Sequence, residues 1–174
     1  LDYLVFAAAD GASGTRTIVD FDEEHGFFSG KGLSMLRGSA SADHALVVNH
    51  RAGHCISRQY FKSVLSDRAK AGFDSLVHVH TDAAKSDSQQ LNRNLLLSDN
   101  AEARSKPELK IDNDDVAASH GSASGQLDDN ELFYLQSRGF SKESARLVLV
   151  DGFAEEIVSE IHEKSVKAHL EEVI

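Results

Sequence analysis

Apolar and polar residues alternate along several short runs of the chain, as half-buried strands require. The run Phe73–His80 shows the alternation most clearly, and four others have a similar texture: 3–8, 15–21, 45–50 and 56–65. We therefore predict a mainly β protein whose strands are each about as long as these runs.

A weak internal repeat accompanies this pattern. Ser66–Ala71, Thr81–Ser86 and Ser98–Ala103 resemble one another, and Asn113–Ala118 is a looser copy. Their aspartates fall at positions 67, 82, 99 and 114, which are nearly evenly spaced. Asp followed by small residues favours a corner, because its carboxylate bonds the local backbone. The spacing favours a β-solenoid, and an antiparallel sandwich is the alternative.

The composition changes after Gly125, where helical signals begin. Asp128 with Glu131 three residues later is typical of a helix start, and Gly139 is suited to end that helix. Ser141 is placed to cap a second helix. We therefore divide the chain into a β-helix core over 1–125 and a helical docking domain over 126–174.

The second predicted helix carries one apolar stripe. Its members recur at every fourth position: Ala145, Leu149, Phe153, Ile157 and Ile161. Gly152 could divide this helix in two, and a last amphipathic turn is expected at Val166, Leu170, Val173 and Ile174. Such helices are marginal alone, so they must pack on the solenoid, on each other or on a partner.

Composition and charge narrow the function. The 174 residues are 41% hydrophobic but only 7% aromatic and contain no Trp, which suits thin repeated layers. The net charge of −10, from 18 basic and 28 acidic side chains, argues against nucleic-acid binding. Cys55 is the single cysteine, so no internal disulfide can form.

Nothing in the sequence indicates a membrane or a secretory route. The longest apolar stretch, Leu4–Ala9, is too short to cross a bilayer. No secretory signal opens the chain, which begins at Leu1 inside a strand pattern, so we expect a piece of a longer protein. The expected location is the cytoplasm, or a plastid or other organelle in a eukaryote.

Four features could carry chemistry, and each has a structural alternative. The histidine pairs His50 with His54 and His78 with His80 could bind a metal, although hydrogen-bonded structural histidines are more common. The repeated aspartates could bind calcium, although turn chemistry explains them more simply. Cys55 is most simply a small buried residue. His120, beside a glycine at the boundary between the two predicted units, is a candidate exposed metal ligand.

A set of specific motifs runs from about Val47 to Ile161: Ser57-Arg58, His78–His80, Asn92–Ser98, Lys106–Leu109, Ser119–Asp129, Glu131–Leu135, Ser137–Gly139 and Gly152–Glu156. Together these motifs resemble the SufB/SufD family, whose members belong to the SUF machinery that assembles iron–sulfur clusters. Residues 1–46 are similar to that family only in texture.

The resemblance implies a right-handed parallel β-helix followed by a small helical domain. It implies a non-catalytic scaffold subunit, not an enzyme, that pairs with a SufB-type subunit or an identical one and docks a SufC-type ATPase. The ATPase would dock on the helical region, for which the resemblance and the apolar helix positions suggest Phe133, Tyr134, Arg138 and Phe153. The structural alternative for both phenylalanines is that they fill the helical core.

The resemblance is closer to SufD than to SufB. The pattern S-H-G-x-x-x-G-Q-L-D at 119–128 is the SufD form, and His120 matches a SufD histidine at the interface with SufB. His120 is thus the candidate ligand for a metal or a transient iron–sulfur cluster, with no cofactor held stably by this chain alone. The cysteine of SufB-type proteins falls on Ile111 by ungapped offset, so no thiolate is expected there. Ala117-Ala118 departs from the Lys-Cys or similar pair that is common in SufD.

The residues by themselves also allow two other functions. A β-solenoid lyase or hydrolase of acidic polysaccharides would need basic residues and carboxylates on one strand face. A purely structural solenoid would associate with itself through its open edge.

Overall fold

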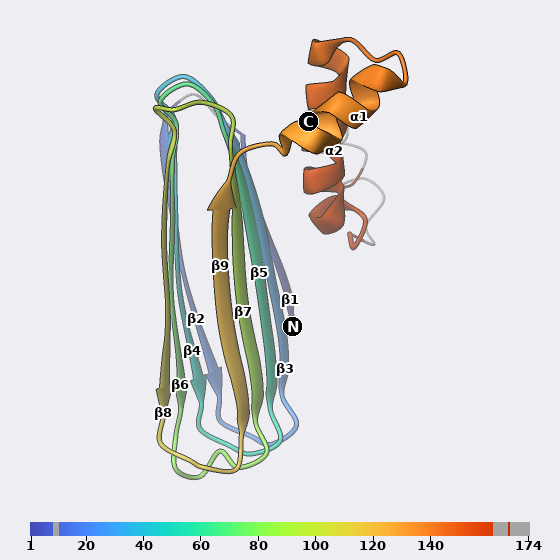
Figure 1. Ribbon diagram of the computed structural model, residues 1–174. Helices are drawn as coiled ribbons and strands as arrows, with labels where there is room; N and C mark the ends of the chain where they lie inside the picture. The colour runs from blue at the N-terminus through green and yellow to red at the C-terminus, as the bar shows by residue number, and fades with distance from the viewer. Residues whose placement is uncertain (9–10, 162–166, 168–174) are drawn as a thin grey trace.

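The computed structural model describes residues 1–8, 11–161 and 167. Strands fill most of it and two helices follow (Figure 1). The strands are β1 (Asp2–Ala7), β2 (Ala12–Phe21), β3 (Phe27–Leu36), β4 (Ser41–His50), β5 (Ile56–Leu65), β6 (Lys70–Val79), β7 (Asp87–Leu96), β8 (Glu102–Ile111) and β9 (Ala117–Gly125). The helices are α1 (Asp129–Ser137) and α2 (Lys142–Val158).

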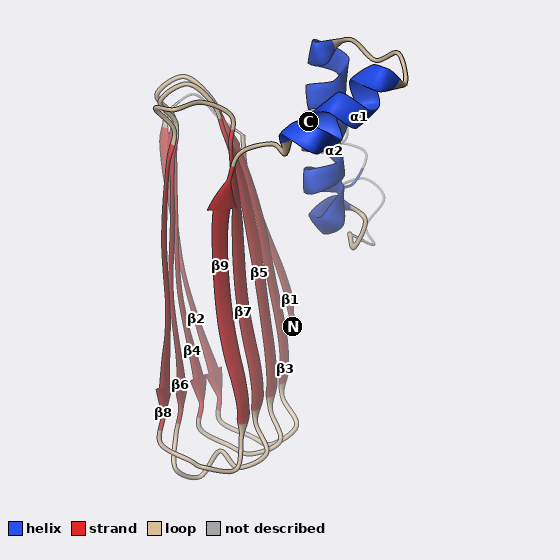
Figure 2. Cartoon of the chain, viewed as in Figure 1, coloured by secondary structure: helices blue, strands red, loops and turns tan. Residues whose placement is uncertain are grey.

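Consecutive strands alternate between two parallel sheets. One sheet has the order β1-β3-β5-β7-β9 and the other β2-β4-β6-β8, with every ladder parallel. Each coil therefore gives one strand to each sheet, and about four coils form a β-solenoid (Figure 2). The predicted solenoid is confirmed and the antiparallel sandwich is excluded. The sequence repeat, one strand and one corner, corresponds to half of one coil.

The repeated aspartates lie at corners, but not in one column. Asp67 and Asp99 follow strands β5 and β7, whereas Asp82 and Asp114 follow β6 and β8 at the opposite end of the coils. Asp67 has a backbone φ of 57°, and its carboxylate accepts a 2.9 Å hydrogen bond from the Gly38 N–H of the preceding coil. The turn interpretation is confirmed at Asp67 by its left-handed backbone, whereas its carboxylate bonds the neighbouring coil rather than its own turn.

Strand β3 was not predicted, because two glycines interrupt its alternation. At Gly32, an added Cβ would lie 2.3 Å from Cδ1 of Phe61, so the glycine leaves room for that inward-facing ring. Phe61 in turn packs on Phe73 of the facing sheet, with ring centroids 4.9 Å apart. Fully burying one such ring stabilises the fold by about 1.5–3 kcal/mol.

The helix caps follow the predictions. The Asp128 carboxylate accepts from the N–H groups of Asn130 and Glu131, and the Ser141 hydroxyl accepts from Ser144 N–H. Gly139, with φ of 98°, follows α1.

One helix prediction is wrong. Gly152 does not divide α2, which is continuous from Lys142 to Val158. A mid-helix glycine costs only about 1 kcal/mol, and the buried residues of α2 on either side of it offset that cost. Ile161 follows the helix rather than belonging to it. The predicted last turn at Val166, Leu170, Val173 and Ile174 lies outside the described residues.

Helix α2 packs on the outer face of the five-stranded sheet, against β3 and β5 (Figure 1). Ala154, Ile157 and Val158 pack on Leu33, while Val150 packs near Val64. Helix α1 packs on α2 and has no buried residue. In the described part of the chain, no helix is long and apolar enough to cross a membrane.

Candidate functional site: the open face of the last coil and the helical hairpin

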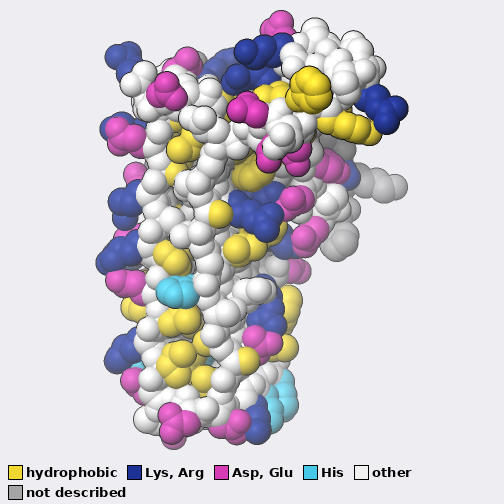
Figure 3. All heavy atoms as spheres, in the orientation of Figure 1, with side chains coloured by type: hydrophobic (Ala, Val, Ile, Leu, Met, Phe, Trp, Pro, Cys, Tyr) yellow, Lys and Arg dark blue, Asp and Glu magenta, His cyan; other side chains and the backbone are white. Residues whose placement is uncertain are grey.

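Strands β8 and β9 form the last coil, and each pairs with one neighbouring strand of the described chain. No further coil of the described residues covers the side chains that point between the sheets here, so Ile111 is 43% exposed and His120 is exposed. This side faces the viewer in Figure 3, where hydrophobic side chains and one histidine lie near the middle and charged side chains gather at the margins. We call this surface, made by β8 and β9, the open face.

The two strands of the open face differ in how their edges are protected. Strand β8 contains Pro107, which has no N–H, together with Lys106 and Lys110, and these are devices that discourage added strands. Strand β9 reads Ala-Ala-Ser-His-Gly-Ser-Ala-Ser-Gly, with neither proline nor a charged residue. The edge of β9 is therefore suited to accept another strand.

His120 lies in the middle of β9 and points toward the facing sheet. Its Nδ1 lies 3.1 Å from the Pro107 carbonyl oxygen. A carbonyl oxygen can only accept, so Nδ1 carries the proton and donates, and Nε2 of the neutral ring keeps its lone pair. This hydrogen bond orients the ring as a ligand, as it does for metal-bound histidines generally.

The described part of the chain gives His120 no complete metal site. Among residues 1–8, 11–161 and 167, no group of three His, Cys, Asp or Glu side chains could hold a metal ion. His78 and His80 do come together, with ring centroids 3.7 Å apart, but His78 Nε2 is bonded at 2.7 Å to Asp112. Burial is the main cause that lowers the pKa of His80, and neighbouring His78 lowers it further.

The other predicted histidine pair is separated by the fold. His50 is buried between the sheets, whereas His54 lies at an exposed corner, where its ring stacks at 4.9 Å on His25. Cys55 is fully buried, and its Sγ lies 3.3 Å from the Glu23 carbonyl oxygen. The interpretation of Cys55 as a small buried residue is confirmed.

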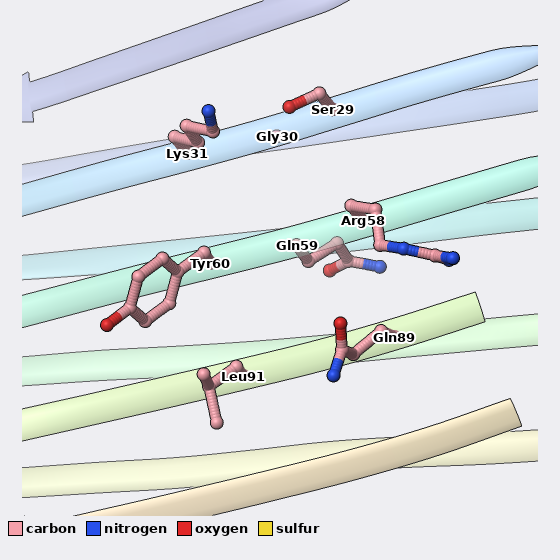
Figure 4. Close-up of a pocket in the computed structure, with 8 residues that line it drawn as sticks. All are labelled: Ser29, Gly30, Lys31, Arg58, Gln59, Tyr60, Gln89 and Leu91. Carbon is pink, nitrogen blue, oxygen red and sulfur yellow. The ribbon is translucent and has the colours of Figure 1, made fainter. Parts of the chain in front are cut away.

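A small hollow of about 120 Å³ lies on the outer face of the five-stranded sheet (Figure 4). Arg58 and Lys31 line it, but both cations are already paired: Arg58 bonds Asp87, and Lys31 bonds Glu160. An anionic ligand in this hollow would therefore have to compete with both carboxylates.

The helical hairpin exposes apolar side chains. Phe133 is 72% exposed, Tyr134 56% and Leu147 58%, although their helices pack on each other. Arg138 lies 5.2 Å from the Tyr134 ring, so these two predicted residues are neighbours. We call the exposed apolar side chains of the two helices, Phe133, Tyr134, Leu147 and Val148, the hairpin patch.

Hollows border the hairpin patch. One of about 390 Å³ is lined by Tyr134, Leu135, Val148 and Leu149 together with Asn130 and Glu131. A second, of about 510 Å³, lies between α2 and the ends of β7 and β9. An exposed apolar surface with adjacent hollows is typical of a protein interaction site.

Phe153, the fourth predicted docking residue, lines the second hollow on the side of α2 that faces the sheet. It packs toward the solenoid, where its ring is 4.1 Å from the ammonium of Lys62 and its carbonyl accepts a 2.7 Å hydrogen bond from the same group. Lys62 is fully buried and forms a 2.6 Å ion pair with Glu156, which also accepts from Tyr60. This cluster holds α2 on the sheet and was not foreseen from the sequence, because a lysine in a strand pattern normally points to solvent.

The electrostatics of this cluster follow from burial and pairing. Burial lowers the pKa of Lys62, and Glu156 partly opposes that effect. Hydrogen bonds from Lys62 and Tyr60 lower the pKa of Glu156. Burial, with the nearby carboxylate, raises the pKa of Tyr60. At neutral pH the three groups are therefore an ammonium, a carboxylate and a neutral phenol.

Comparison with known proteins identifies the family of this chain. The family model described as "SUF system FeS cluster assembly, SufBD core domain" matches residues 2–153. The chain belongs to the SufB/SufD family. Within this family, the chain is 39% identical over 120 residues to the iron-sulfur cluster assembly protein SufD of Escherichia coli. The aligned residues make up 69% of this chain and 28% of that protein. The sequence resemblance to SufD is thereby confirmed.

Two further relatives extend the comparison. SufD of Bacillus subtilis is 37% identical over 111 residues, covering 64% of this chain and 25% of that protein. The chloroplastic protein ABCI7 of Arabidopsis thaliana is 35% identical over 123 residues, covering 70% and 26%. The chain thus spans about a quarter of the length of these relatives, and it is a SufD-like member of the iron–sulfur cluster assembly proteins.

Proposed function

We propose that this SufD-like chain is a scaffold subunit without enzymatic activity of its own, in a complex that assembles iron–sulfur clusters. It pairs through the open face with a SufB-type subunit or with an identical subunit, and its helical unit, residues 126–174, docks a SufC-type ATPase. The relatives are named as assembly proteins rather than enzymes, which supports the absence of catalysis. We expect it in the cytoplasm or, in a plant, in the chloroplast, where the name of one relative places that protein.

The unprotected edge of β9 is the observation that carries the pairing proposal. An edge strand offers a row of N–H and C=O groups, and this one has no charge or proline to repel an added strand. The facing strand β8 contains both a proline and charged residues, so a partner strand should add to β9 rather than to β8. Pairing there would also cover His120 and the exposed apolar residues of the last coil.

His120 supports the role in cluster assembly. Its Nε2 lone pair is exposed, and neutral imidazole is a ligand for iron. Because the described residues supply no second and third ligand nearby, the nascent cluster would be held between His120 and groups of the paired subunit. The cluster in this proposal is cargo, held until it is transferred.

A pairing experiment can test the edge. Ser119→Lys places a charge on β9, and Gln89→Lys places the same charge on β7, one strand inward in the same register and on the same face. Subunit association, measured by sedimentation of the co-expressed subunits, should weaken at least tenfold in Ser119→Lys and stay unchanged in Gln89→Lys. Equal association of both variants would refute pairing through β9.

A second measurement tests His120. His120→Ala should leave subunit association near wild type but abolish cluster assembly on the complete complex, followed by the absorbance of the bound cluster. Wild-type levels of assembly in His120→Ala would remove the ligand role and leave the pairing proposal standing.

The ATPase docking proposal rests on α1. This helix buries no residue of its own, yet exposes Phe133 and Tyr134 beside hollows that could receive partner side chains. Such a helix gains little from the solenoid, so a partner that covers the hairpin patch explains its apolar residues. The ATPase is the partner that the family resemblance supplies.

Docking can be tested by pull-down of the full-length parent protein with the SUF ATPase of the same genome, with and without residues 127–174. Leu147→Asp in the hairpin patch should lower the affinity at least tenfold. The matched control Ile18→Asp alters a 56% exposed apolar residue on β2 and should bind normally. Binding that survives loss of residues 127–174 would place the docking surface elsewhere. If the full-length protein does not bind the ATPase but still self-associates, it would be a structural solenoid.

A further inference from the structure

A column of polar side chains runs along the inside of the solenoid and ends at His120. Gln59 of β5, Gln90 of β7 and His120 of β9 are direct partners in successive ladders, and we call this column the polar rung. On the β3 side of Gln59, its partner in the ladder is Gly30, where an added Cβ would lie 2.8 Å from Cζ of Phe28. The Phe28 ring therefore closes the polar rung at its inner end.

The two glutamines of the polar rung are almost completely buried, at 2% and 1% exposure. Ser75 of the facing sheet joins them: its hydroxyl donates to Gln59 Oε1 at 2.6 Å and accepts from Gln90 Nε2 at 3.2 Å. Gln90 Nε2 also donates to the Glu108 carbonyl oxygen at 3.3 Å. These hydrogen bonds cross the interior, from the side chains of β5 and β7 to the Ser75 hydroxyl of β6 and the Glu108 main-chain carbonyl of β8.

These hydrogen bonds determine which side-chain atom is Oε1 and which is Nε2 in Gln59 and in Gln90. The Glu108 carbonyl needs a donor, so Nε2 of Gln90 must face it. Ser75 then accepts from Gln90, and its own proton needs an acceptor, so Oε1 of Gln59 must face Ser75. The remaining ends are Gln59 Nε2, a donor, and Gln90 Oε1, an acceptor, and neither has a partner among the described residues.

Two buried unpaired groups of opposite kind on adjacent strands are costly, because each has lost its hydrogen bonds to water. A single water molecule can accept from the Gln59 N–H and donate to Gln90 Oε1, and buried waters typically make such bonds to otherwise unsatisfied groups. The two glutamine groups together offer the lower limit of the two to four polar contacts that a buried water needs.

We propose that the interior of the last coils contains a built site for an ordered water molecule, bound by Gln59 Nε2 and Gln90 Oε1, directly behind His120. The site does not depend on any metal or cluster at His120. It assigns the buried glutamines a role in keeping the interior hydrated next to the open face.

A crystal structure of the chain, alone or in its complex, at a resolution that shows ordered water tests this site. The expected result is a well-ordered water within hydrogen-bond distance of both Gln59 Nε2 and Gln90 Oε1. Gln59→Leu should lose that water, whereas Gln89→Leu, which changes the exposed neighbour on the outer face, should keep it.

Two results would overturn the site. One is an interior without water in the wild-type chain, and the other is a direct hydrogen bond between the two glutamine side chains. If Gln59→Leu does not fold, magnetisation transfer from long-lived water to the Gln59 side-chain amide in the wild-type protein decides the matter by solution NMR. Absence of that transfer would refute the site. Neither result depends on whether His120 supports cluster assembly, so failure of the site and failure of the proposed function are distinguishable.

Discussion

The buried imidazole of His50 should make the stability of this protein depend on pH. The ring is fully buried, and its Nε2 lies 2.9 Å from the Ser57 hydroxyl, which itself donates to Ser88 at 3.0 Å. Ser57 therefore accepts from Nε2–H, and Nδ1 keeps a lone pair that has no partner among the described residues. Protonation would create a buried N–H without an acceptor, so burial lowers the pKa of His50 to about 4, with Asp87 partly opposing this.

The direction and size of this pH effect follow from the difference between the pKa of His50 in the folded chain and in the unfolded chain. The unfolded chain takes up a proton as the pH falls through 6.5, whereas the folded chain stays neutral at this ring until about pH 4. Stability is therefore lost as the pH falls through this window, by about 1.4 kcal/mol per pH unit. Between pH 7 and pH 5 the loss from His50 is about 2 kcal/mol. Burial also lowers the pKa of His44, which adds a loss of the same sign.

Urea unfolding at pH 7 and pH 5, followed by circular dichroism, measures this effect. His50→Gln keeps a side-chain donor for Ser57 but cannot take up a proton, so its loss between the two pH values should be about 2 kcal/mol smaller than that of the wild type. His54→Gln is the control, because His54 lies at an exposed corner. If His50→Gln loses as much stability as the wild type, the buried ring is not the source of the pH dependence.

Further substitutions test how the solenoid and α2 are held. Glu156→Gln should lower the free energy of unfolding by about 1–3 kcal/mol, because it leaves the buried Lys62 ammonium without its carboxylate. Lys62→Met should lower it by less, because the freed Glu156 carboxylate is half-exposed and can be hydrated. Gly32→Ala should cost about 1–3 kcal/mol, because its Cβ would displace the Phe61 ring. Urea unfolding at pH 7 measures all three.

Matched controls separate these effects from general perturbation. Glu155→Gln changes the exposed neighbour in α2 and should shift stability by no more than about 0.5 kcal/mol. Gly14→Ala adds a Cβ whose nearest contact is the Asp43 carbonyl oxygen at 3.8 Å, so it should be tolerated. Equal costs for Lys62→Met and Glu156→Gln would contradict the burial asymmetry, and an unchanged Gly32→Ala would show that the Phe61 ring can move freely.

The repeating part of the molecule and its helix caps were predictable from the amino-acid order. Alternation in runs such as Phe73–His80 and Asp at the corners are local properties, because a strand has a period of two and Asp tolerates the backbone geometry of a turn. The caps at Asp128 and Ser141 are equally local, and both formed as expected. The SufD-type motif around His120 indicated the family before any contact was known.

Which residues meet across the coils was settled by the three-dimensional fold. Ile56 pairs with Asp87, and Asp87 pairs with Ala117, although these two steps along the chain differ in length. The register therefore depends on corner lengths that vary from coil to coil, so the alignment of Gln59 with Gln90 and then with His120 could not be read from spacing. His50 is buried because it faces inward at the end of β4, whereas His54 lies in the following corner and is exposed.

The attachment of α2 was also beyond the sequence. An apolar stripe predicts that a helix packs, but it does not name the surface, because many apolar faces bury similar area. Here Lys62 is buried because the helix that covers it supplies Glu156 and the Phe153 carbonyl. A lysine in a strand is normally hydrated, and only a partner that the fold brings from far along the chain makes its burial tolerable.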